Sequence, residues 1–291
     1  MNHGATIVSE TPLKITLETG FIGAKSWPED ASVTGTSTFF LCSVAAKGVS
    51  VLKNPALEPH VLAVRRMLSG MGARIKDDGS GGIVIEGVDR LGGGRFLVPD
   101  DHHEVATFLA IGAASGGRVR VETNLTDELT LILSQLRKLG VEIELDNGAV
   151  TVTGWTKVVA QPFTKTILPK IEAAPWPYFP ADLLPQMIGL AIGCNSEVLF
   201  WNKIYEGALG WVGELSKFGA RVIVCDPHRV IVGPSTALTP GIVEAPYIIR
   251  VVLGLVIAAF QIDGRSVINN ADPIWRAHHT YPLRSGRRRF H

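Results

Sequence analysis

The sequence has few cysteines and no long apolar run. Its three cysteines, Cys42, Cys194 and Cys225, occur singly in a chain of 291 residues, without Cys-x-x-Cys spacing. This pattern argues against a disulfide framework, a metal site and a cysteine nucleophile, and favours buried, reduced thiols. The most apolar run, 251–260, is much shorter than the roughly 20 residues of a membrane span. The first ten residues lack a hydrophobic signal region. We therefore expect a soluble, cytoplasmic protein with no membrane partner.

The chain also lacks an excess of charge of either sign. Lys and Arg number 28 against 27 Asp and Glu, giving a net charge of +1. Such a balance provides no general attraction to nucleic acid or to anionic membranes. Four of the last eight residues are arginine, but such a run is usually a solvated tail, so we expect no nucleic-acid partner. The histidine pairs His102, His103 and His278, His279 have no third ligand at metal spacing, which favours surface or capping roles and predicts no metal site.

Glycine is abundant and marks an internal repeat. The phrases "MGARI", "LGVEI" and "FGARV" surround Gly72, Gly140 and Gly219, and "HGATIV" supplies a further copy at Gly4. The four glycines are spaced 68, 68 and 79 residues apart. Equal periods with similar flanking residues indicate a repeated structural unit. The glycine is expected to end a helix, where a residue tolerant of positive φ is favoured.

Each repeat is predicted to contain a helix, a strand, a second helix and two further strands. In the best-defined copy these are residues 104–115, 118–122, 126–139, 141–145 and 149–154, with "DNG" as the hairpin turn. In a second copy the two helical regions are 37–52 and 58–72, and in a third copy they are 183–193 and 207–219. A fourth unit covers 246–260 and 265–268 and ends in a degraded version of the repeated phrase at 283–290. With 46% hydrophobic residues, the chain has enough apolar material for two globular domains.

Several stretches, in order along almost the whole chain, resemble the enolpyruvyl transferases, and within them the members acting on UDP-N-acetylglucosamine. These stretches are "SVTGT" (32–36), "NPALEPHV" (54–61), "MGARI" with "IVIEGVDRLGGG" (83–94), "VPDDHHEVATFLAIGAA" (98–114), "FPADLLPQ" (179–186) and "ELSKFGARV".

The resemblance implies an α/β fold of repeated βαβαββ units, an inside-out α/β barrel arranged as two pseudo-symmetric globules. Residues 1–97 are expected to form part of the first globule, which is incomplete. Residues 98–291 are expected to form the second, with an aberrant end from about residue 277. The chain is therefore interpreted as truncated at its N-terminus and at its C-terminus.

The resemblance also implies an activity. Enolpyruvyl transferases of this kind add the 3′-hydroxyl of UDP-N-acetylglucosamine to carbon 2 of phosphoenolpyruvate, protonate the methylene and expel phosphate, in peptidoglycan precursor synthesis. The expected partners are these two substrates and a separately encoded N-terminal globule. No metal or organic cofactor is implied.

Two aspartates match positions of the family's site. Asp182 matches the general base of the Phe-Pro-x-Asp motif, whose carboxylate takes the hydroxyl proton. It also precedes a helix, so an N-cap role is the alternative. Asp101 matches a position near the sugar nucleotide, but Asp101 and Glu104 have the spacing of a capping box.

Two arginines match positions that contact phosphoenolpyruvate. Arg250 and Arg276 suit this role because a guanidinium binds carboxylate or phosphate in a bidentate manner. Arg250 lies inside an otherwise apolar helix and therefore requires either a ligand or a partner, so a buried ion pair is its alternative.

A short turn and one hydrophobic residue complete the expected substrate contacts. Ser32, Val33, Thr34 and Gly35 match the turn whose backbone N–H groups hold the nucleotide diphosphate, a use suited to a helix N-terminus. Ile204 matches a position where a backbone group meets the sugar nucleotide.

Other positions depart from the family pattern. Ala208 and Leu57 stand where the family has arginine, and the family's reactive cysteine loop and Lys-Asn pair would precede Met1. Because the reaction depends on several cations aimed at phosphate and carboxylate, we expect activity that is impaired or requires a missing N-terminal segment. The alternatives are a non-catalytic UDP-sugar-binding homologue and an inactive fragment.

Overall fold

The computed structural model describes residues 3–125, 127–153 and 167–276. It divides into two compact units, Met1–Asp101 with Pro175–Pro177 and His102–Ala174 with Tyr178–His291. The division falls close to the predicted boundary at 97/98. The assignment of these units to two pseudo-symmetric globules stays a prediction.

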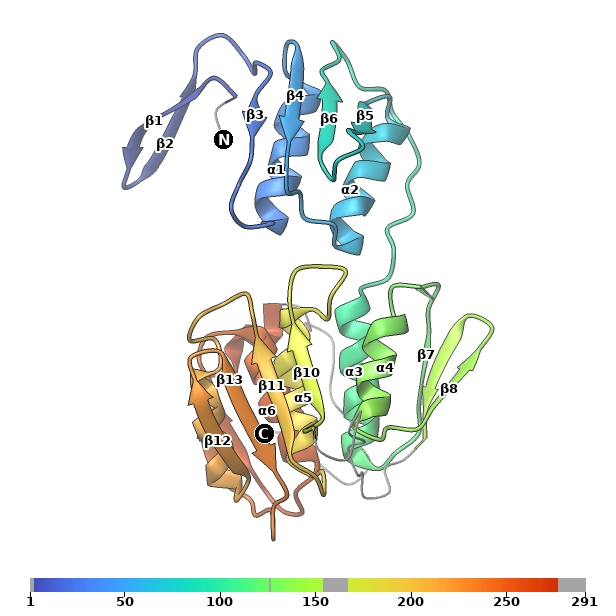
Figure 1. The fold of residues 1–291 in the computed structure, drawn as a ribbon, viewed down its shortest axis with the longest axis vertical. Coiled ribbons are helices and arrows are strands. Elements are labelled where there is room, and N and C mark those ends of the chain that lie inside the picture. Colours follow the sequence, from blue (N-terminus) through green and yellow to red (C-terminus); the bar gives the residue numbers. More distant parts are fainter. Residues whose placement is uncertain (1–2, 126, 154–166, 277–291) are drawn as a thin grey trace. The chain divides into compact units, whose positions relative to one another are not determined.

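The first unit contains a hairpin followed by one complete repeat (Figure 1). Its elements are β1 (Ala5–Glu10), β2 (Leu13–Leu17), β3 (Lys25–Ser26), α1 (Val33–Val44), β4 (Val49–Leu52), α2 (Pro59–Gly70), β5 (Arg74–Asp77) and β6 (Ile83–Glu86). β1 and β2 form a separate antiparallel sheet, whereas the other strands form one sheet in the order β3-β4-β6-β5. The apolar residues of α1 and of the central strands, including Phe39, Phe40 and Ile85, form the core of this unit.

The second unit contains two further repeats and part of a third. Its elements are α3 (His102–Ser115), β7 (Val119–Glu122), α4 (Thr130–Lys138), β8 (Ile143–Asp146), β9 (Ala149–Val152), β10 (Lys170–Ala173), η1 (Ala181–Leu183), α5 (Leu184–Ala191), β11 (Val198–Asn202), η2 (Gly210–Phe218), β12 (Arg221–Asp226), β13 (Arg229–Gly233), β14 (Ile242–Glu244), α6 (Ile249–Phe260), β15 (Val267–Asn269) and η3 (Asp272–Arg276). The sheet orders are β7-β9-β8, β10-β11-β13-β12 and β14-β15.

The sheets confirm the predicted repeat. In β3-β4-β6-β5 and in β10-β11-β13-β12 the first two strands are parallel and the other neighbours are antiparallel. Each sheet is built from the same succession, βαβαββ, with the 3₁₀ segment η2 in place of the second helix in one of them. The predicted α/β class is therefore confirmed. The strands of the described residues form five separate sheets, and none of these closes into a barrel.

The repeated glycines end their helical segments as predicted. Gly4, Gly72, Gly140 and Gly219 all have positive φ, of 84°, 100°, 84° and 76°. In the three copies with a described helical segment, the residue after the glycine donates its N–H to a carbonyl five residues earlier, which is the Schellman pattern. The bonds are Ala73 to Leu68 (2.9 Å), Val141 to Leu136 (3.1 Å) and Ala220 to Leu215 (3.2 Å).

Two expectations from the sequence are wrong. The helix expected over 207–219 is the 3₁₀ segment η2, in a stretch where Gly207, Gly210 and Gly213 lower helix propensity. Cys225 is exposed, because it lies on β12 at the edge of its sheet, whereas Cys194 is buried. Burial raises the pKa of the Cys194 thiol to about 12. The degraded phrase at 283–290 lies outside the described residues.

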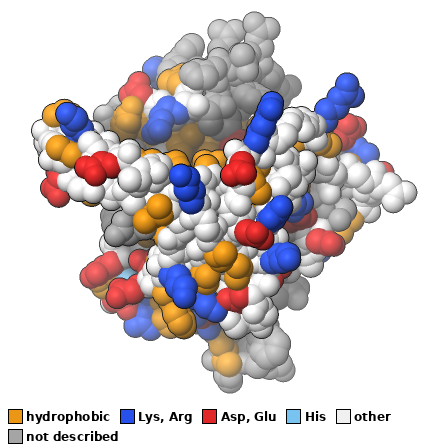
Figure 2. Space-filling view, turned by 90° about the horizontal axis from the view of Figure 1, so that it is seen from above, with side chains coloured by type: hydrophobic (Ala, Val, Ile, Leu, Met, Phe, Trp, Pro, Cys, Tyr) orange, Lys and Arg blue, Asp and Glu red, His pale blue; other side chains and the backbone are white. Residues whose placement is uncertain are grey.

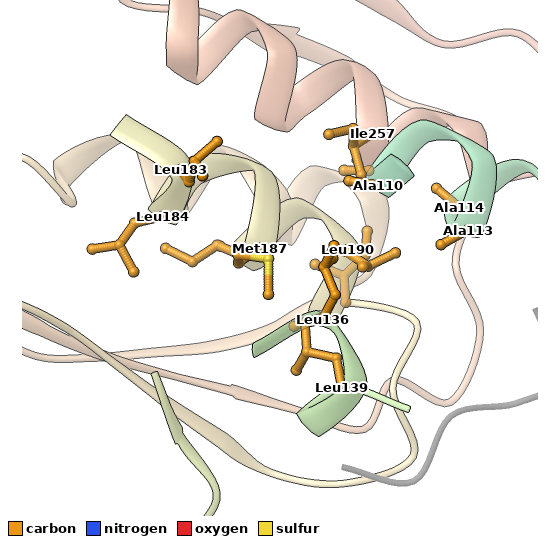
Figure 3. Close-up of a cluster of buried hydrophobic side chains, with 14 of the residues drawn as sticks. Ala110, Ala113, Ala114, Leu136, Leu139, Leu183, Leu184, Met187, Leu190 and Ile257 are labelled. Atoms are coloured by element: carbon orange, nitrogen blue, oxygen red, sulfur yellow. The ribbon is translucent and has the colours of Figure 1, made fainter. Parts of the chain in front are cut away.

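The core of the second unit joins its repeats. Figure 3 shows Ala110 and Ala113 of α3, Leu136 of α4, Met187 of α5 and Ile257 of α6 gathered in one cluster. Close contact between α5 and α6 depends on Gly189 and Gly254, because a Cβ at Gly189 would lie 2.1 Å from the Gly254 carbonyl oxygen.

Two surface properties bear on possible partners. No helix in the described part of the chain is both long and apolar enough to cross a bilayer. On the face drawn in Figure 2, Lys and Arg side chains are interspersed with Asp and Glu. The expected absence of a nucleic-acid partner stays a prediction.

Candidate functional site

Most of the predicted site residues lie at the start of the first helix in their repeat. Residues 32–35 begin α1, Asp101 immediately precedes α3, Asp182 lies in η1 just before α5, and Arg250 is in the first turn of α6. The repeat therefore places chemically different side chains near the starts of corresponding helices.

Three of these helix starts meet in the second unit. Arg250 Nη1 lies 3.3 Å from Glu104 Oε1, and Arg250 Nε lies 3.8 Å from Asp182 Oδ2. We call Glu104, Asp182 and Arg250 the acid–arginine cluster. The Arg250 side chain is 18% exposed and that of Asp182 is 54% exposed. The cluster thus combines a largely buried guanidinium with a carboxylate that reaches solvent.

The position of Arg250 explains why it has acidic partners. The rest of α6 is apolar, and the residues from Val251 to Ala258 are all buried. A cation in the first turn of a helix is also opposed by the helix dipole. Two carboxylates offset the cost of burying the cation and the unfavourable effect of the dipole. They hold the guanidinium at the N-terminal end of α6. The ion pair considered from the sequence is therefore present.

Asp182 does not cap the helix that follows it. The N-cap of α5 is Leu183, that of η1 is Pro180, and neither makes a side-chain capping hydrogen bond. The N-cap role, which is the alternative to a catalytic role for Asp182, is therefore wrong. An exposed carboxylate without a capping role is available to accept a proton from a bound hydroxyl. Its catalytic role stays a prediction.

Glu104 was not identified from the sequence as a site residue. Its spacing from Asp101 predicts only a capping box, and it lies in the first turn of α3. Its contact with Arg250 joins residues 146 positions apart in the chain. The sequence offered one signal, which is that Glu104 is an acidic residue close to the predicted site residue Asp101. Its pairing with Arg250 could not be predicted, because that contact is formed only when α3 packs against α6.

The turn at 32–35 has the geometry of an anion-binding helix start. Ser32 is the N-cap of α1, and its Oγ accepts a hydrogen bond from Gly35 N at 3.1 Å. The N–H groups of Val33 and Thr34 lie in the first turn, where no intrahelical acceptor exists. Ser32 and Thr34 are exposed. The turn could therefore hold phosphate oxygens through backbone N–H groups, and this use stays a prediction.

Ile204 and Arg276 lie elsewhere in the second unit. Ile204 follows β11, and its N–H donates to Asn202 Oδ1 at 3.0 Å. Its carbonyl accepts no hydrogen bond from the described residues, so the carbonyl is the backbone group available to a ligand. Arg276 is exposed at the end of η3, and no ion pair joins it to the acid–arginine cluster in the described ranges.

The sequence favours surface or capping roles for the histidines at the start of α3, but the structure buries them. His102 and His103 are both buried, with ring centroids 4.0 Å apart. Together with Asp101 they place ligand atoms within 4.8 Å of one another, which corrects the expectation that no third ligand lies nearby. Three consecutive residues of this kind do not by themselves form a metal site.

Comparison with solved structures agrees with this architecture. The enolpyruvyl transferase NikO from Streptomyces tendae matches with a TM-score of 0.79 and 21% identity, over 94% of this chain and 66% of that one. An EPSP synthase from Acinetobacter baumannii matches with a TM-score of 0.70 and 17% identity, over 97% of this chain and 67% of that one. The fold is therefore that of an enolpyruvyl transferase.

Sequence comparison then assigns the family. Residues 3–283 match the family model described as EPSP synthase (3-phosphoshikimate 1-carboxyvinyltransferase), and the chain belongs to this family. It is 34% identical over 257 residues to a UDP-N-acetylglucosamine 1-carboxyvinyltransferase of Borreliella burgdorferi, covering 88% of this chain and 60% of that protein. It is 33% identical over 253 residues to the protein of the same name from Bacteroides thetaiotaomicron, covering 86% and 58%. The chain thus spans about three fifths of the length of these relatives.

Proposed function

We propose that the chain carries the general base and a phosphoenolpyruvate-binding arginine of an enolpyruvyl transferase. The acceptor is the 3′-hydroxyl of UDP-N-acetylglucosamine, and the product is a peptidoglycan precursor. The observation that carries this proposal is the proximity of Asp182 and Arg250. These residues match two different roles in the family's reaction, and a transfer between two substrates requires both roles at one place. The names of the relatives support the choice of acceptor.

In the proposed reaction Asp182 accepts the proton of the 3′-hydroxyl as its oxygen attacks carbon 2 of phosphoenolpyruvate. The methylene carbon takes up a proton to become a methyl group, which gives a tetrahedral intermediate. This intermediate then loses a proton from the methyl group and expels phosphate, and these two losses restore the carbon–carbon double bond. Arg250 binds the carboxylate or phosphate of phosphoenolpyruvate through its planar fork. Before substrate arrives, Glu104 and Asp182 hold this guanidinium in place.

The turn at 32–35 and the carbonyl of Ile204 are proposed to bind the sugar nucleotide, the former through its diphosphate. Asp101 is proposed to lie near the same substrate, and Arg276 to contact phosphoenolpyruvate. The proposed reaction calls for no metal or organic cofactor. The cytoplasmic location expected from the sequence stays a prediction.

A segment that carries the family's reactive cysteine loop is proposed to complete the site. The family's reactive cysteine loop has no counterpart among Cys42, Cys194 and Cys225, and Cys194 is buried with a raised pKa. A thiol in that state is a poor nucleophile. Activity of these residues without such a segment is therefore proposed to be low.

A second candidate function is UDP-sugar binding without catalysis. It is favoured by Leu57 and Ala208, which stand where the family carries arginine. Fewer cations around phosphoenolpyruvate weaken transition-state stabilisation more than they weaken sugar-nucleotide binding.

Phosphate release from phosphoenolpyruvate, with and without UDP-N-acetylglucosamine, tests the proposal. We expect slow release that requires both substrates and falls by about 100-fold or more in Asp182→Asn, because a general base contributes on the order of 10²–10⁴ to the rate. The matched control is Asp146→Asn, which changes an exposed aspartate of the β8–β9 hairpin.

Calorimetric titration with UDP-N-acetylglucosamine separates the alternatives. Saturable binding without any phosphate release would support the non-catalytic binder. A chain that is folded by circular dichroism and neither binds the sugar nucleotide nor releases phosphate would contradict both candidates.

A further inference from the structure

The loop that follows β11 is organised by one buried amide side chain. Asn202, the last residue of β11, is 3% exposed. Its Oδ1 accepts two backbone hydrogen bonds, from Ile204 N at 3.0 Å and from Tyr205 N at 3.1 Å. An asparagine side chain that binds the backbone a few residues further on forms an Asx turn, which fixes the path of the chain. The two peptide groups that flank Ile204 are therefore both held by Asn202.

The hydrogen bond from Tyr205 sets the direction of the Ile204 carbonyl. The C=O of Ile204 and the N–H of Tyr205 belong to one planar peptide group, and in a trans peptide these two bonds point in opposite directions. Since the N–H points at Asn202 Oδ1, the carbonyl oxygen points away from that buried side chain. The carbonyl is thus held as an acceptor for an N–H or O–H group of a ligand.

The first unit shows that packing alone does not require an asparagine at this place. Leu52 ends β4 and pairs with Ser26, the last residue of β3. In the same way Asn202 ends β11 and pairs with Ala173, the last residue of β10. In both repeats the next residue donates its N–H to the carbonyl of that paired residue, at 2.9 Å and 3.0 Å. Leu52 is buried, as Asn202 is, so this position accommodates an apolar side chain.

The chain also turns differently after these two strands. Asn54, two residues beyond β4, has a positive φ of 53°. Ile204 lies two residues beyond β11 and is not among the described non-glycine residues with positive φ. A β-branched side chain makes that conformation costly. The chain after β11 therefore turns around the Asn202 side chain, in the repeat that carries the proposed backbone contact to the sugar nucleotide.

The turn between β12 and β13 anchors Asn202 through its backbone. The Asn202 N–H donates to the His228 carbonyl at 2.9 Å, and the Asn202 carbonyl lies 2.9 Å from His228 Nδ1. Since a carbonyl can only accept, Nδ1 carries the proton of this second bond. The far end of the loop is tied to the same turn, because Gly207 N donates to Pro227 O at 3.2 Å. His228 thus fixes the backbone of Asn202, whose side chain fixes the loop.

We propose that Asn202 is a positioning residue for sugar-nucleotide binding. Its Oδ1 turns the Ile204 carbonyl away from the protein interior, and the carbonyl oxygen accepts a hydrogen bond from an N–H or O–H group of the ligand. This role rests on the proposed function, which supplies the ligand. Part of the affinity for the sugar nucleotide is then set by a buried amide that does not touch it.

Amide hydrogen exchange, followed by NMR, tests the loop geometry without a ligand. Asn202→Leu removes the acceptor and introduces the side chain that Leu52 contributes in the first unit. We expect exchange at Ile204 and Tyr205 to become several-fold faster in this variant, because both N–H groups lose their acceptor. It should stay slow in Asn202→Asp, whose carboxylate can accept both bonds. The matched control is Asn195→Leu at an exposed position of the same repeat, which should leave the exchange of both amides unchanged.

Calorimetric titration tests the effect on binding. Affinity for UDP-N-acetylglucosamine should fall about 2- to 10-fold in Asn202→Leu, which is the range for one hydrogen bond, and should be largely restored in Asn202→Asp. Affinity for phosphoenolpyruvate should not change, which separates positioning of the loop from a general loss of structure. His228→Phe removes the second anchor and should also lower the affinity for the sugar nucleotide. Circular dichroism confirms that each variant is folded.

The outcomes distinguish this role from the proposed function. Unchanged amide exchange in Asn202→Leu overturns the positioning role, and so does unchanged affinity for UDP-N-acetylglucosamine where the unmodified chain binds it. Both results leave the proposed function standing. Equal losses of affinity for the two substrates would make Asn202 a structural residue only. An unmodified chain that does not bind UDP-N-acetylglucosamine contradicts the proposed function, and the positioning role then fails with it.

Discussion

Asp182 Oδ2 and Arg250 Nε lie 3.8 Å apart although the two residues come from successive repeats of the chain. Glu104, from a third repeat, lies 3.3 Å from the same guanidinium. All three occupy the start of the first helix in their repeat. A repeated unit can therefore assemble a site of mixed charge when its copies carry different side chains near the starts of these helices.

Arg250→Met separates a binding role for this arginine from a purely structural one. The change removes a cation that the α6 dipole opposes, and it leaves two carboxylates that still reach water. We therefore expect the free energy of unfolding to fall by less than about 2 kcal/mol. Affinity for phosphoenolpyruvate should fall by about tenfold or more, because a hydrogen bond to a charged group contributes roughly 1.5–3 kcal/mol. Urea unfolding and calorimetric titration measure the two quantities.

The control for this change is Arg265→Met, which alters an exposed arginine of the same unit. It should leave both quantities unchanged. If Arg250→Met reduced stability by several kcal/mol and left the affinity for phosphoenolpyruvate unaltered, Arg250 would be a structural residue only.

The repeat could be predicted from the sequence because its signal is local. A Schellman end requires positive φ at one position, so Gly72, Gly140 and Gly219 report the helix ends directly. The 3₁₀ form of η2 could not be predicted in this way. The stretch "GALGWVGELSKFG" has apolar residues at the spacing of an α-helix, and this spacing does not distinguish an α-helix from a 3₁₀ helix.

The site was predictable only residue by residue. Family resemblance singled out Asp182 and Arg250, but the contact of Arg250 with Glu104 depends on the packing of α3 against α6. The same packing buries His102 and His103, which a reading of local spacing placed at the surface. Burial and long-range pairing are decided by tertiary structure, and no short motif reports them.

Two glycines at the end of α2 should respond to alanine with opposite signs. Gly72 has a φ of 100°, and no heavy atom lies within 4 Å of a Cβ built there. The cost of Gly72→Ala is therefore backbone strain alone, about 1–2 kcal/mol of lost stability. Gly70 is helical with equally open space, so Gly70→Ala should gain up to about 1 kcal/mol. Urea unfolding followed by circular dichroism measures both, and equal effects would contradict the Schellman assignment.

Asp78 should make the stability of the first unit depend on pH in the acid range. The Lys53 ammonium, followed by the N–H groups of Ser80 and Gly82, holds the pKa of this carboxyl well below its usual value of 3.8. A folded-state pKa below the unfolded one gives stability that is present above about pH 3.8 and is lost as the pH falls toward the folded-state pKa.

Asp78→Asn removes this contribution. The difference in urea midpoint between the two proteins should be constant from pH 7 to about pH 5 and should shrink below about pH 3.8. Asp89→Asn, at an exposed position of the same unit, serves as the control and should show no such trend. A difference that grew on acidification would mean that the pKa of Asp78 is raised by folding.

The crossing of α5 and α6 should tolerate no side chain at Gly189. A Cβ there would lie 2.1 Å from the carbonyl oxygen of Gly254, and one at Gly254 would lie 2.5 Å from that of Pro185. These neighbours are backbone atoms, so relief requires the helices to separate and disturbs the core that also holds Arg250 in place. We expect Gly189→Ala to lower the free energy of unfolding by about 3 kcal/mol or more. Gly213→Ala, which meets no heavy atom within 4 Å, should change it by less than about 1 kcal/mol, and similar losses for the two variants would refute the close approach.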